Sequence, residues 1–233
     1  MTNTPYALVT GASSGIGLAI SRTLIANNIH VYGIGRSFDT PIVSELFTPI
    51  VCDLTKTGEL TNTINKLKKD IPFSYVIHNA GVGYFGPHEE QNPAKIHEMT
   101  CVNLEVPMLL TNLLLRDIKA CNGTFIFISS VTAHKSNTHG CAYGATKAGL
   151  SSFARSLFDE VRKYGVKVVI IHPDMTQSNF YRNANFTACD DLSTSLIPED
   201  IANAVEAVIK QRDGLVINEI TLVPQYHRIE RKS

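Results

Sequence analysis

Short apolar runs alternate along this chain with longer segments whose apolar residues recur every three or four positions. The runs are rich in Val and Ile and almost continuously apolar, which is typical of strands buried on both faces of a parallel sheet. Strands are expected at 6–10, 29–35, 47–52, 73–78, 124–129, 166–171 and 215–222. Helices are expected at 15–27, 56–69, 93–119, 142–164 and 198–211. Strand–helix repetition of this kind predicts an α/β fold, a doubly wound parallel β-sheet of about seven strands with helices on both faces.

The composition limits the kinds of protein that this chain can be. It has 233 residues, 44% of them apolar, and its 21 basic residues balance its 21 acidic ones. This size and balance predict one domain over residues 1–233 and give no indication of a nucleic-acid partner. No apolar run approaches the ~20 residues that span a bilayer, and no signal sequence is evident, so we expect no membrane contact and a cytoplasmic location. The five cysteines are scattered without a C-x-x-C motif, which disfavours a disulfide framework or a zinc site.

A glycine-rich turn joins the first expected strand to the first expected helix, in the segment "TGASSGIG". Gly11, Gly15 and Gly17 allow a tight turn, and they let the backbone of a helix N-terminus approach a phosphate closely. Ser13 and Ser14 add hydroxyl groups that either bind phosphate or cap the helix. In this strand–turn–helix context the glycines predict a dinucleotide-binding site.

The end of the second expected strand, "YGIGRSF", bears on the choice of cofactor. An acidic residue at this place binds the ribose 2′-hydroxyl in NAD-binding folds, but here Gly35 stands in that position and Arg36 follows it. An arginine pairs well with a phosphate group. We therefore expect NADP(H) to be preferred, with Arg36 and Ser37 on the 2′-phosphate, while NAD(H) remains possible; a solvent-facing arginine is the alternative.

Tyr143 and Lys147 lie four positions apart in an expected helix, so that both side chains are on one helical face. A nearby ammonium group favours the charged form of a phenol, as a tyrosine that acts as acid or base requires. Taken alone, the pair is also compatible with two neighbours on an ordinary helix. The rest of the sequence decides between these interpretations.

Several motifs occur together in the order typical of one family. "TGASSGIG", "CDLT", "NAG", "VNLEVP" and "ISSVTA" precede "YGATK", and with them the chain resembles the short-chain dehydrogenase/reductase family almost from end to end. The resemblance implies a Rossmann fold, an oxidoreductase activity and a catalytic tetrad of Asn103, Ser130, Tyr143 and Lys147. It implies a cofactor site formed by Gly11, Ser13, Ser14, Gly15, Ile16, Gly17, Arg36, Ser37, Asp53, Leu54, Asn79, Ala80, Gly81, Tyr143, Lys147, Pro173, Thr176 and Ser178.

The resemblance also implies how the tetrad works. Tyr143 would exchange a proton with the substrate oxygen, and Ser130 would bind that oxygen. Lys147 would favour the phenolate and bind the nicotinamide ribose, while Asn103 would hold a water molecule that links Lys147 to solvent. The expected reaction moves a hydride between nicotinamide and a small carbonyl compound or secondary alcohol.

Substrate choice is expected to depend on loops beyond the carboxyl ends of the strands. Residues 175–197 are predicted to form a lid, with Phe180 and Tyr84 joining Ser130 and Tyr143 in the substrate site. Asp174 stands where the family usually has glycine. A looser similarity to bacterial 3-hydroxy acid dehydrogenases and 3-oxoacyl reductases, together with the family resemblance, implies a homodimer or homotetramer.

Three alternatives stay open at this point. The same fold is compatible with an NADP(H)-binding regulatory module with little catalysis, and with an NAD(H)-dependent dehydrogenase. His134 and His139, between Ser130 and Tyr143, permit a serine–histidine hydrolase or a metal site. No G-x-S-x-G motif surrounds Ser130 and no third ligand with metal-site spacing lies nearby, so we expect neither a hydrolase nor a metal.

Overall fold

Seven parallel strands form the central sheet of the computed structural model, which describes residues 4–39, 42–226 and 228–231. Their order across the sheet is β3-β2-β1-β4-β5-β6-β8. The strands are β1 (Tyr6–Thr10), β2 (His30–Gly35), β3 (Phe47–Val51), β4 (Phe73–His78), β5 (Thr124–Ile128), β6 (Lys167–Pro173) and β8 (Glu219–Leu222). The predicted parallel sheet is confirmed, and each pairing within it is parallel.

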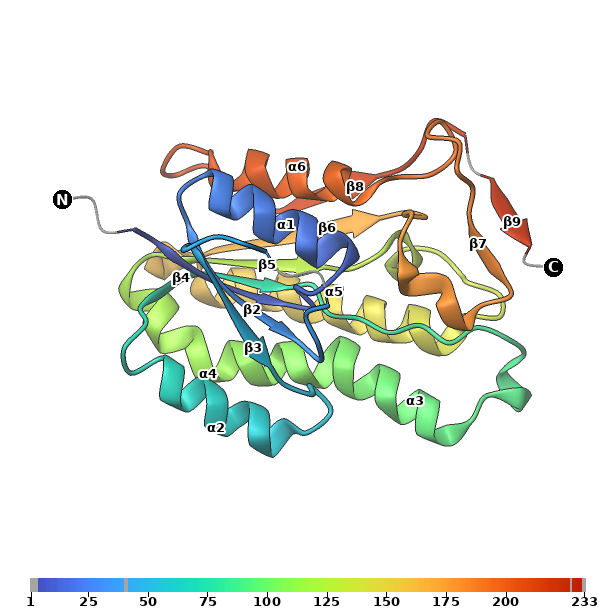
Figure 1. Ribbon diagram of the computed structural model, residues 1–233, viewed down its shortest axis with the longest axis horizontal. Coiled ribbons are helices and arrows are strands. Elements are labelled where there is room, and N and C mark those ends of the chain that lie inside the picture. Colours follow the sequence, from blue (N-terminus) through green and yellow to red (C-terminus); the bar gives the residue numbers. More distant parts are fainter. Residues whose placement is uncertain (1–3, 40–41, 227, 232–233) are drawn as a thin grey trace.

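Helices cover both faces of this sheet (Figure 1). On one face lie α1 (Gly15–Ala26) and α6 (Pro198–Ile209), and on the other lie α2 (Thr57–Leu67), α4 (Val106–Ala120) and α5 (Cys141–Val161). Each layer has its own apolar core; Ile20 and Val205 belong to the first, and Leu60 and Leu110 to the second. The inner strands β1, β4, β5 and β6 are largely apolar on both sides because each side packs against one of these layers.

The helix expected at 93–119 is interrupted. It consists of α3 (Pro93–Thr100), a π-helical turn η2 (Cys101–Glu105) and then α4. A π-turn shifts the hydrogen bonds of the backbone by one residue and often lies at a functional site. Asn103 is fully buried in the middle of this turn.

A second, two-stranded sheet was not expected. The short strand β7 (Phe186–Ala188) pairs with β9 (Ile229–Arg231) in antiparallel register, Phe186 opposite Arg231 and Ala188 opposite Ile229. Strand β7 belongs to the predicted lid, 175–197, which also contains the 3₁₀ helix η5 (Asn179–Asn183). The lid is therefore attached to a segment that follows the last strand of the main sheet (Figure 1).

Three further 3₁₀ helices, η1 (His88–Glu90), η3 (Val131–Ala133) and η4 (Arg162–Tyr164), lie in the connections. No helix within the described ranges has the length and apolar character needed to cross a membrane.

Candidate active site

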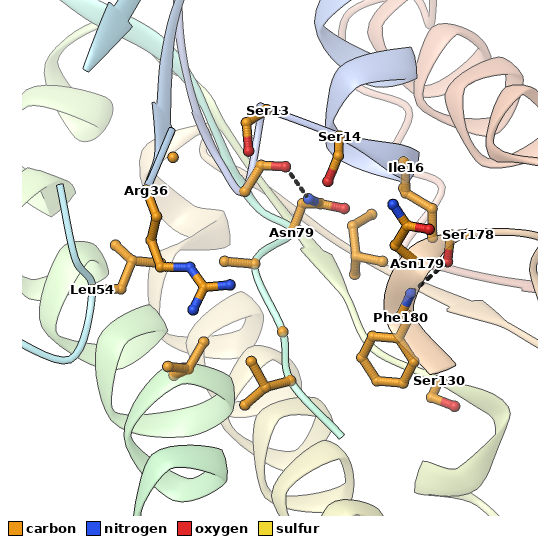
Figure 2. Close-up of a pocket in the computed structure, with 18 of the residues that line it drawn as sticks. Ser13, Ser14, Ile16, Arg36, Leu54, Asn79, Ser130, Ser178, Asn179 and Phe180 are labelled. Atoms are coloured by element: carbon orange, nitrogen blue, oxygen red, sulfur yellow. Dashed lines mark hydrogen bonds between the residues drawn. The ribbon is translucent and has the colours of Figure 1, made fainter. Parts of the chain in front are cut away.

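A cleft of about 510 Å³ lies at the carboxyl ends of the parallel strands. The chain reverses its direction across the sheet between β1 and β4, and ligands bind at such a switch point in open α/β sheets. Loops that follow β1, β2, β4, β5 and β6 all line the cleft. Figure 2 shows Arg36 on one side of it and Ser130 and Phe180 on the other. The cleft is therefore elongated, with a basic group on one side and polar side chains on the opposite one.

The glycine-rich turn lies beside the start of α1. Gly11 and Gly15 have φ values of 69° and 53°, which glycine adopts without strain. A Cβ atom on Gly17 would clash with the carbonyl oxygen of Gly11, so Gly17 permits the close packing of the turn against the helix rather than lining the cleft. Asn79 Nδ2 donates to the carbonyl oxygens of Thr10 at 2.9 Å and Gly11 at 3.3 Å, which fixes the turn to β4 (Figure 2).

The N-terminus of α1 is open toward the cleft. Ser14 is the N-cap residue in extended conformation, but its side chain makes no capping hydrogen bond. Ser13, Ser14 and Ile16 all line the cleft (Figure 2). Free backbone N–H groups and the positive end of a helix dipole favour an anion here, as the sequence predicts for a pyrophosphate.

The Arg36 end of the cleft contains three of the expected cofactor residues and lacks a fourth. Arg36 is exposed at the end of β2 and lines the cleft with Asp53 and Leu54. The backbone N–H and hydroxyl of Thr55 donate to Asp53 at 3.0 and 2.8 Å, and these hydrogen bonds hold the pKa of Asp53 below its ordinary value. Ser37 does not line the cleft, because its hydroxyl is turned toward Asp39 at 3.3 Å.

The "NAG" segment follows β4 directly. Thr10 Oγ1 accepts hydrogen bonds from the backbone N–H groups of Asn79 at 3.1 Å and Ala80 at 3.0 Å. Asn79, Ala80 and Gly81 all line the cleft, as expected of cofactor residues. A hydroxyl at the end of β1 thus positions the first residues after β4.

Tyr143 and Lys147 lie on the same face of α5 and are both buried, with exposed fractions of 7% and 3%. Lys147 Nζ donates to the carbonyl oxygen of Ile128 at 2.8 Å and lies 5.9 Å from the centre of the Tyr143 ring. Burial lowers the pKa of Lys147 to about 8. Burial also raises the pKa of Tyr143 above its ordinary value, and a hydrogen bond with Ser130 opposes that rise. Without a ligand, Tyr143 is therefore a neutral phenol.

Ser130 stands just beyond the end of β5. Its side-chain oxygen accepts a hydrogen bond from the backbone N–H of Thr132 at 3.2 Å and so caps η3. This contact leaves the hydroxyl hydrogen available to a neighbour. Ser130, Tyr143 and Lys147 line one end of the cleft together, as the sequence predicts.

Asn103 takes a different place from the other three tetrad residues. Its Oδ1 accepts from the backbone N–H of Val82 at 2.8 Å, and its Nδ2 donates to the Val82 carbonyl at 2.9 Å and to Thr146 Oγ1 at 3.1 Å. The side chain does not line the cleft. It attaches the segment that follows "NAG" to α5, and its expected role in holding a water molecule stays a prediction.

The loop after β6 keeps its shape without the usual glycine. Pro173, Thr176 and Ser178 line the cleft as expected, together with Asp174. Asp174 is not among the described residues with positive φ, so a side chain is accommodated there without strain. Asp174 Oδ1 accepts from the N–H of Met175 at 2.8 Å, which stabilises the turn.

An aromatic cluster surrounds the Tyr143 ring. Phe85 and Phe180 contact it with ring centres 5.6 and 5.5 Å away, and Tyr181 and Phe186 pack around Phe85 at 6.3 and 5.2 Å. Three of these aromatic residues belong to the lid, so the lid lies closed over Tyr143. Phe180 is where the sequence predicts a substrate contact.

Tyr84 is not in the cleft. Its hydroxyl donates to Glu98 Oε2 at 2.8 Å and accepts from Lys95 Nζ at 3.0 Å, and these bonds turn it toward α3. The neighbouring Phe85 provides the aromatic contact with Tyr143 instead. Glu98 and His97, which also line the cleft, were missed because neither belongs to a motif.

Comparisons with known proteins agree with this geometry. The short chain dehydrogenase family model matches residues 5–188. A probable NADP-dependent dehydrogenase of Haemophilus influenzae is 29% identical over 95% of this chain and 94% of its own length. Serine 3-dehydrogenase of Rhizobium radiobacter is 30% identical over 93% and 92% of the two chains.

Solved structures have the same fold. An alcohol dehydrogenase from the archaeon Thermococcus sibiricus, complexed with 5-hydroxy-NADP, superposes with a TM-score of 0.88 at 26% identity over 97% of this chain and 99% of that one. A metagenomic short-chain oxidoreductase in complex with NADP gives a TM-score of 0.81 at 28% identity over 95% and 98% of the chains. From the family match, the cleft and the order of its motifs, we conclude that this chain belongs to the short-chain dehydrogenase family.

Proposed function

We propose that this protein is an NADP(H)-dependent oxidoreductase that transfers a hydride between the nicotinamide ring and the carbon of a carbonyl group or secondary alcohol. One observation carries the proposal above all. Tyr143, Lys147 and Ser130 meet at one end of a cleft that also contains an open helix N-terminus and Arg36. NADP(H) has its reactive nicotinamide ring at one end and its 2′-phosphate near the other. One extended molecule would therefore place the ring beside Tyr143 and the 2′-phosphate beside Arg36.

The preference for NADP(H) rests on Arg36. Gly35 forms the cleft wall at the end of β2, and a carboxylate in its place would repel a 2′-phosphate. The exposed guanidinium of Arg36 is able to approach that phosphate. The relative named NADP-dependent and the two structures complexed with NADP or its derivative support this preference. NAD(H) lacks the phosphate and would gain nothing from Arg36.

The remaining cofactor residues would each contact a different part of the dinucleotide. The glycine turn with Ser13, Ser14 and Ile16 would hold the pyrophosphate, and Asp53 and Leu54 would lie at the adenine. Ser178 and Thr176 would contact the nicotinamide half. When bound, the nicotinamide supplies or accepts the hydride.

The protein's own side chains would carry out the proton transfer in this reaction. Ser130 would donate a hydrogen bond to the substrate oxygen, and Tyr143 would deliver a proton to it as the hydride reaches the carbon. A neutral phenol is the form required for this step, and burial favours that form of Tyr143. In the oxidative direction the phenolate is required, and the Lys147 ammonium together with an oxidised nicotinamide would stabilise it. We therefore propose carbonyl reduction as the direction for which Tyr143 already has the required protonation state.

The aromatic cluster indicates the substrate class. Phe85 and Phe180 contact the Tyr143 ring, and Phe180 and Tyr181 line the cleft. Asp174 lines the same cleft, with Lys135 Nζ 3.9 Å from its Oδ2. Apolar walls beside a carboxylate favour an uncharged carbonyl compound with an apolar substituent. A 3-oxo acid is the second candidate, because Arg182 of the lid also lines the cleft and would pair with a substrate carboxylate.

The first test replaces Tyr143 by Phe. The variant should bind NADPH as the wild type does, while the rate of NADPH oxidation falls by about 10³-fold, since a positioned acid or base contributes 10²–10⁴. Fluorescence of bound NADPH measures the binding, and oxidation of NADPH against matched apolar ketones and 3-oxo acids measures the rate. Serine 3-dehydrogenase suggests serine with NADP⁺ as a further substrate to assay.

The outcomes separate the candidates. Turnover of apolar ketones in preference to 3-oxo acids supports the uncharged class, and the reverse order supports the role of Arg182. Tight NADPH binding without turnover of any compound in the panel would favour a cofactor-binding regulatory protein. Undiminished turnover in the Tyr143→Phe variant would contradict the proposed mechanism.

A further inference from the structure

Three potential metal ligands meet at the edge of the sheet, behind Ser130. His134 follows η3, His172 lies near the end of β6 and Glu219 begins β8. His134 Nε2 is 3.2 Å from His172 Nε2, and His172 Nε2 is 3.3 Å from Glu219 Oε2. All three atoms lie within 4.8 Å of one another. The spacing in the sequence provided no third ligand near His134. The fold brings His172 and Glu219 to it from distant parts of the chain.

The hydrogen bonds of His172 indicate which of its two ring nitrogens carries the hydrogen. Its Nδ1 lies 3.3 Å from the carbonyl oxygen of Ser130, which is an acceptor, so Nδ1 carries the hydrogen. In the neutral ring Nε2 then has only a lone pair, and that lone pair faces the Glu219 carboxylate, another acceptor. The His172 side chain is fully buried, so water does not separate the two. Glu219 is 32% exposed, but at this distance a proton or a cation between the two acceptor atoms would remove their repulsion.

A proton shared between His172 Nε2 and Glu219 Oε2 would involve only two of the three groups. His134 Nε2 is able to satisfy His172 Nε2, but it does not remove the contact between the lone pair and the carboxylate. A cation ligated by all three groups would satisfy each of them.

We propose that His134 Nε2, His172 Nε2 and Glu219 Oε2 form a zinc-binding site. Zinc binds imidazole nitrogen and carboxylate oxygen at about 2.0–2.2 Å in tetrahedral geometry, which places neighbouring ligand atoms about 3.3–3.5 Å apart. The two separations in the structure, 3.2 and 3.3 Å, come close to that spacing without rearrangement. The exposed side chain of His134 gives the ion a path from solvent, and water would complete the fourth position.

Neighbouring groups hold two of the three ligands in place by hydrogen bonds. The Ser130 carbonyl fixes the tautomer of His172, as carbonyl groups commonly do for zinc-binding histidines. Arg155 Nε donates to Glu219 Oε1 at 2.6 Å, and its Nη2 reaches Oε2 at the longer distance of 3.2 Å. Oε1 would stay with Arg155 while Oε2 turns to the ion, so that Arg155 both orients Glu219 and competes with zinc for it.

The site would connect the metal to the active centre through one residue. The His172 ring contacts the backbone carbonyl of Ser130, whose hydroxyl is predicted to bind the substrate. Zinc would fix the ring and hold the segment from Ser130 to His134 against β6 and β8. His172 is thereby a positioning residue, and the ion takes no part in the chemistry.

The experiment measures zinc binding by the full chain after treatment with EDTA and removal of the chelator. Isothermal titration with Zn²⁺, and metal analysis after desalting, should give one ion per chain in the wild type. His134→Ala changes an exposed side chain and should fold normally, as a thermal melt will check, yet bind zinc at least tenfold more weakly. His88→Ala is the matched control, because His88 contacts Cys141 at 3.4 Å and is the competing place where zinc would bind.

Cobalt gives an independent measure of the ligands. Co²⁺ should produce the strong visible absorption of a four-coordinate ion without a thiolate charge-transfer band, because the site contains no cysteine. Equal zinc binding in the wild type and His134→Ala would overturn the proposal, as would loss of binding in His88→Ala or a thiolate band. These measurements need no substrate, so their failure is independent of the proposed reductase activity.

Discussion

At the scale of single residues, the active centre buries two ionisable groups, and neither has its ordinary proton affinity. Burial raises the pKa of Tyr143 and lowers that of Lys147 to about 8. Both shifts disfavour the charged forms, which leaves a neutral tyrosine and a lysine with a weakened hold on its proton. Under the proposed mechanism, the positive charge of an oxidised nicotinamide would help to form the phenolate that the oxidative direction uses.

Replacement of Arg36 by Ala tests the cofactor preference. A charge-assisted hydrogen bond contributes about 1.5–3 kcal/mol, so the Kd for NADPH should rise roughly 10- to 100-fold. The Kd for NADH should stay within about twofold, since NADH has no group at that place. Titration of both cofactors by fluorescence measures the two constants; a similar loss for NADH would mean that Arg36 does not contact the 2′-phosphate.

His78 predicts how stability depends on pH. Its ring is buried in β4 against Phe127, with ring centres 4.6 Å apart, and burial lowers its pKa from 6.5 to about 3. A histidine with a lowered pKa in the folded state stabilises the protein fully above its unfolded pKa. That contribution falls as the pH drops from about 6.5 toward 3. At pH 5 the expected loss is about 2 kcal/mol in the free energy of unfolding.

The matched variant is His78→Gln. It retains a polar group near Thr111, whose Oγ1 lies 3.1 Å from His78 Nε2, but it does not titrate. Urea unfolding at pH 7 and pH 5 gives the free energies of both proteins. The wild type should lose about 2 kcal/mol more than the variant over this range, because the other titrating groups are common to both. Identical losses would contradict the assignment to His78.

Single residues also show which parts of the site could be predicted from the sequence and which could not. Most of the predicted cofactor residues line the cleft, because they belong to motifs whose strand ends converge. Ser37 and Tyr84 do not, since hydrogen bonds to Asp39 and Glu98 turn their side chains elsewhere. Such local bonds depend on neighbours in space, which no motif specifies. The cluster of His134, His172 and Glu219 was missed for the same reason, as its members are separated by 38 and 47 positions.

At the scale of elements, the packing of α1 against the glycine turn can be tested with two glycines. Gly17→Ala should destabilise the protein by about 1–3 kcal/mol and weaken NADPH binding, because the new Cβ would meet the Gly11 carbonyl. Gly58→Ala, near the start of α2, has no neighbour within 4 Å and should be neutral or stabilising by up to about 1 kcal/mol. Urea unfolding and NADPH titration compare the two variants. Equal effects of the two substitutions would mean that close packing is not the reason why position 17 requires a glycine.

The elements were predictable where burial imposes a pattern on the sequence. All seven strands of the main sheet were located, most readily β1, β4, β5 and β6, whose buried apolar runs are nearly continuous. The π-turn Cys101–Glu105 was not, since a shift in backbone hydrogen bonds leaves the spacing of apolar residues nearly unchanged. Strands β7 and β9 have three residues each, too few for an alternating pattern, and depend on each other for hydrogen bonds.

At the scale of the whole molecule, the cleft draws its walls from both halves of the sheet, so a cofactor bound there should stabilise the fold as a unit. At a concentration of 100 times its Kd, NADPH should add about 2.7 kcal/mol. For a chain of this size that corresponds to a rise in Tm of roughly 5–10 °C. Differential scanning fluorimetry with NADPH and NADH at equal concentrations measures the effect.

The expected rise is larger with NADPH than with NADH, and the difference should disappear in the Arg36→Ala variant. A rise of the same size with both cofactors would contradict the preference for NADP(H). Assembly into a homodimer or homotetramer stays a prediction at this scale. Sedimentation with and without NADPH tests it, and a monomer under both conditions would contradict it.

The pairing of β7 with β9 has a consequence for the newly made chain. Synthesis proceeds from the N-terminus, and domains begin to fold before the chain is complete. The cofactor turn, α5 and β6 all precede the lid in the sequence, whereas residues 229–231, which pair with it, emerge from the ribosome much later. A nascent chain would therefore acquire a place for the dinucleotide before its substrate pocket is closed, and translation itself would delay the first turnover.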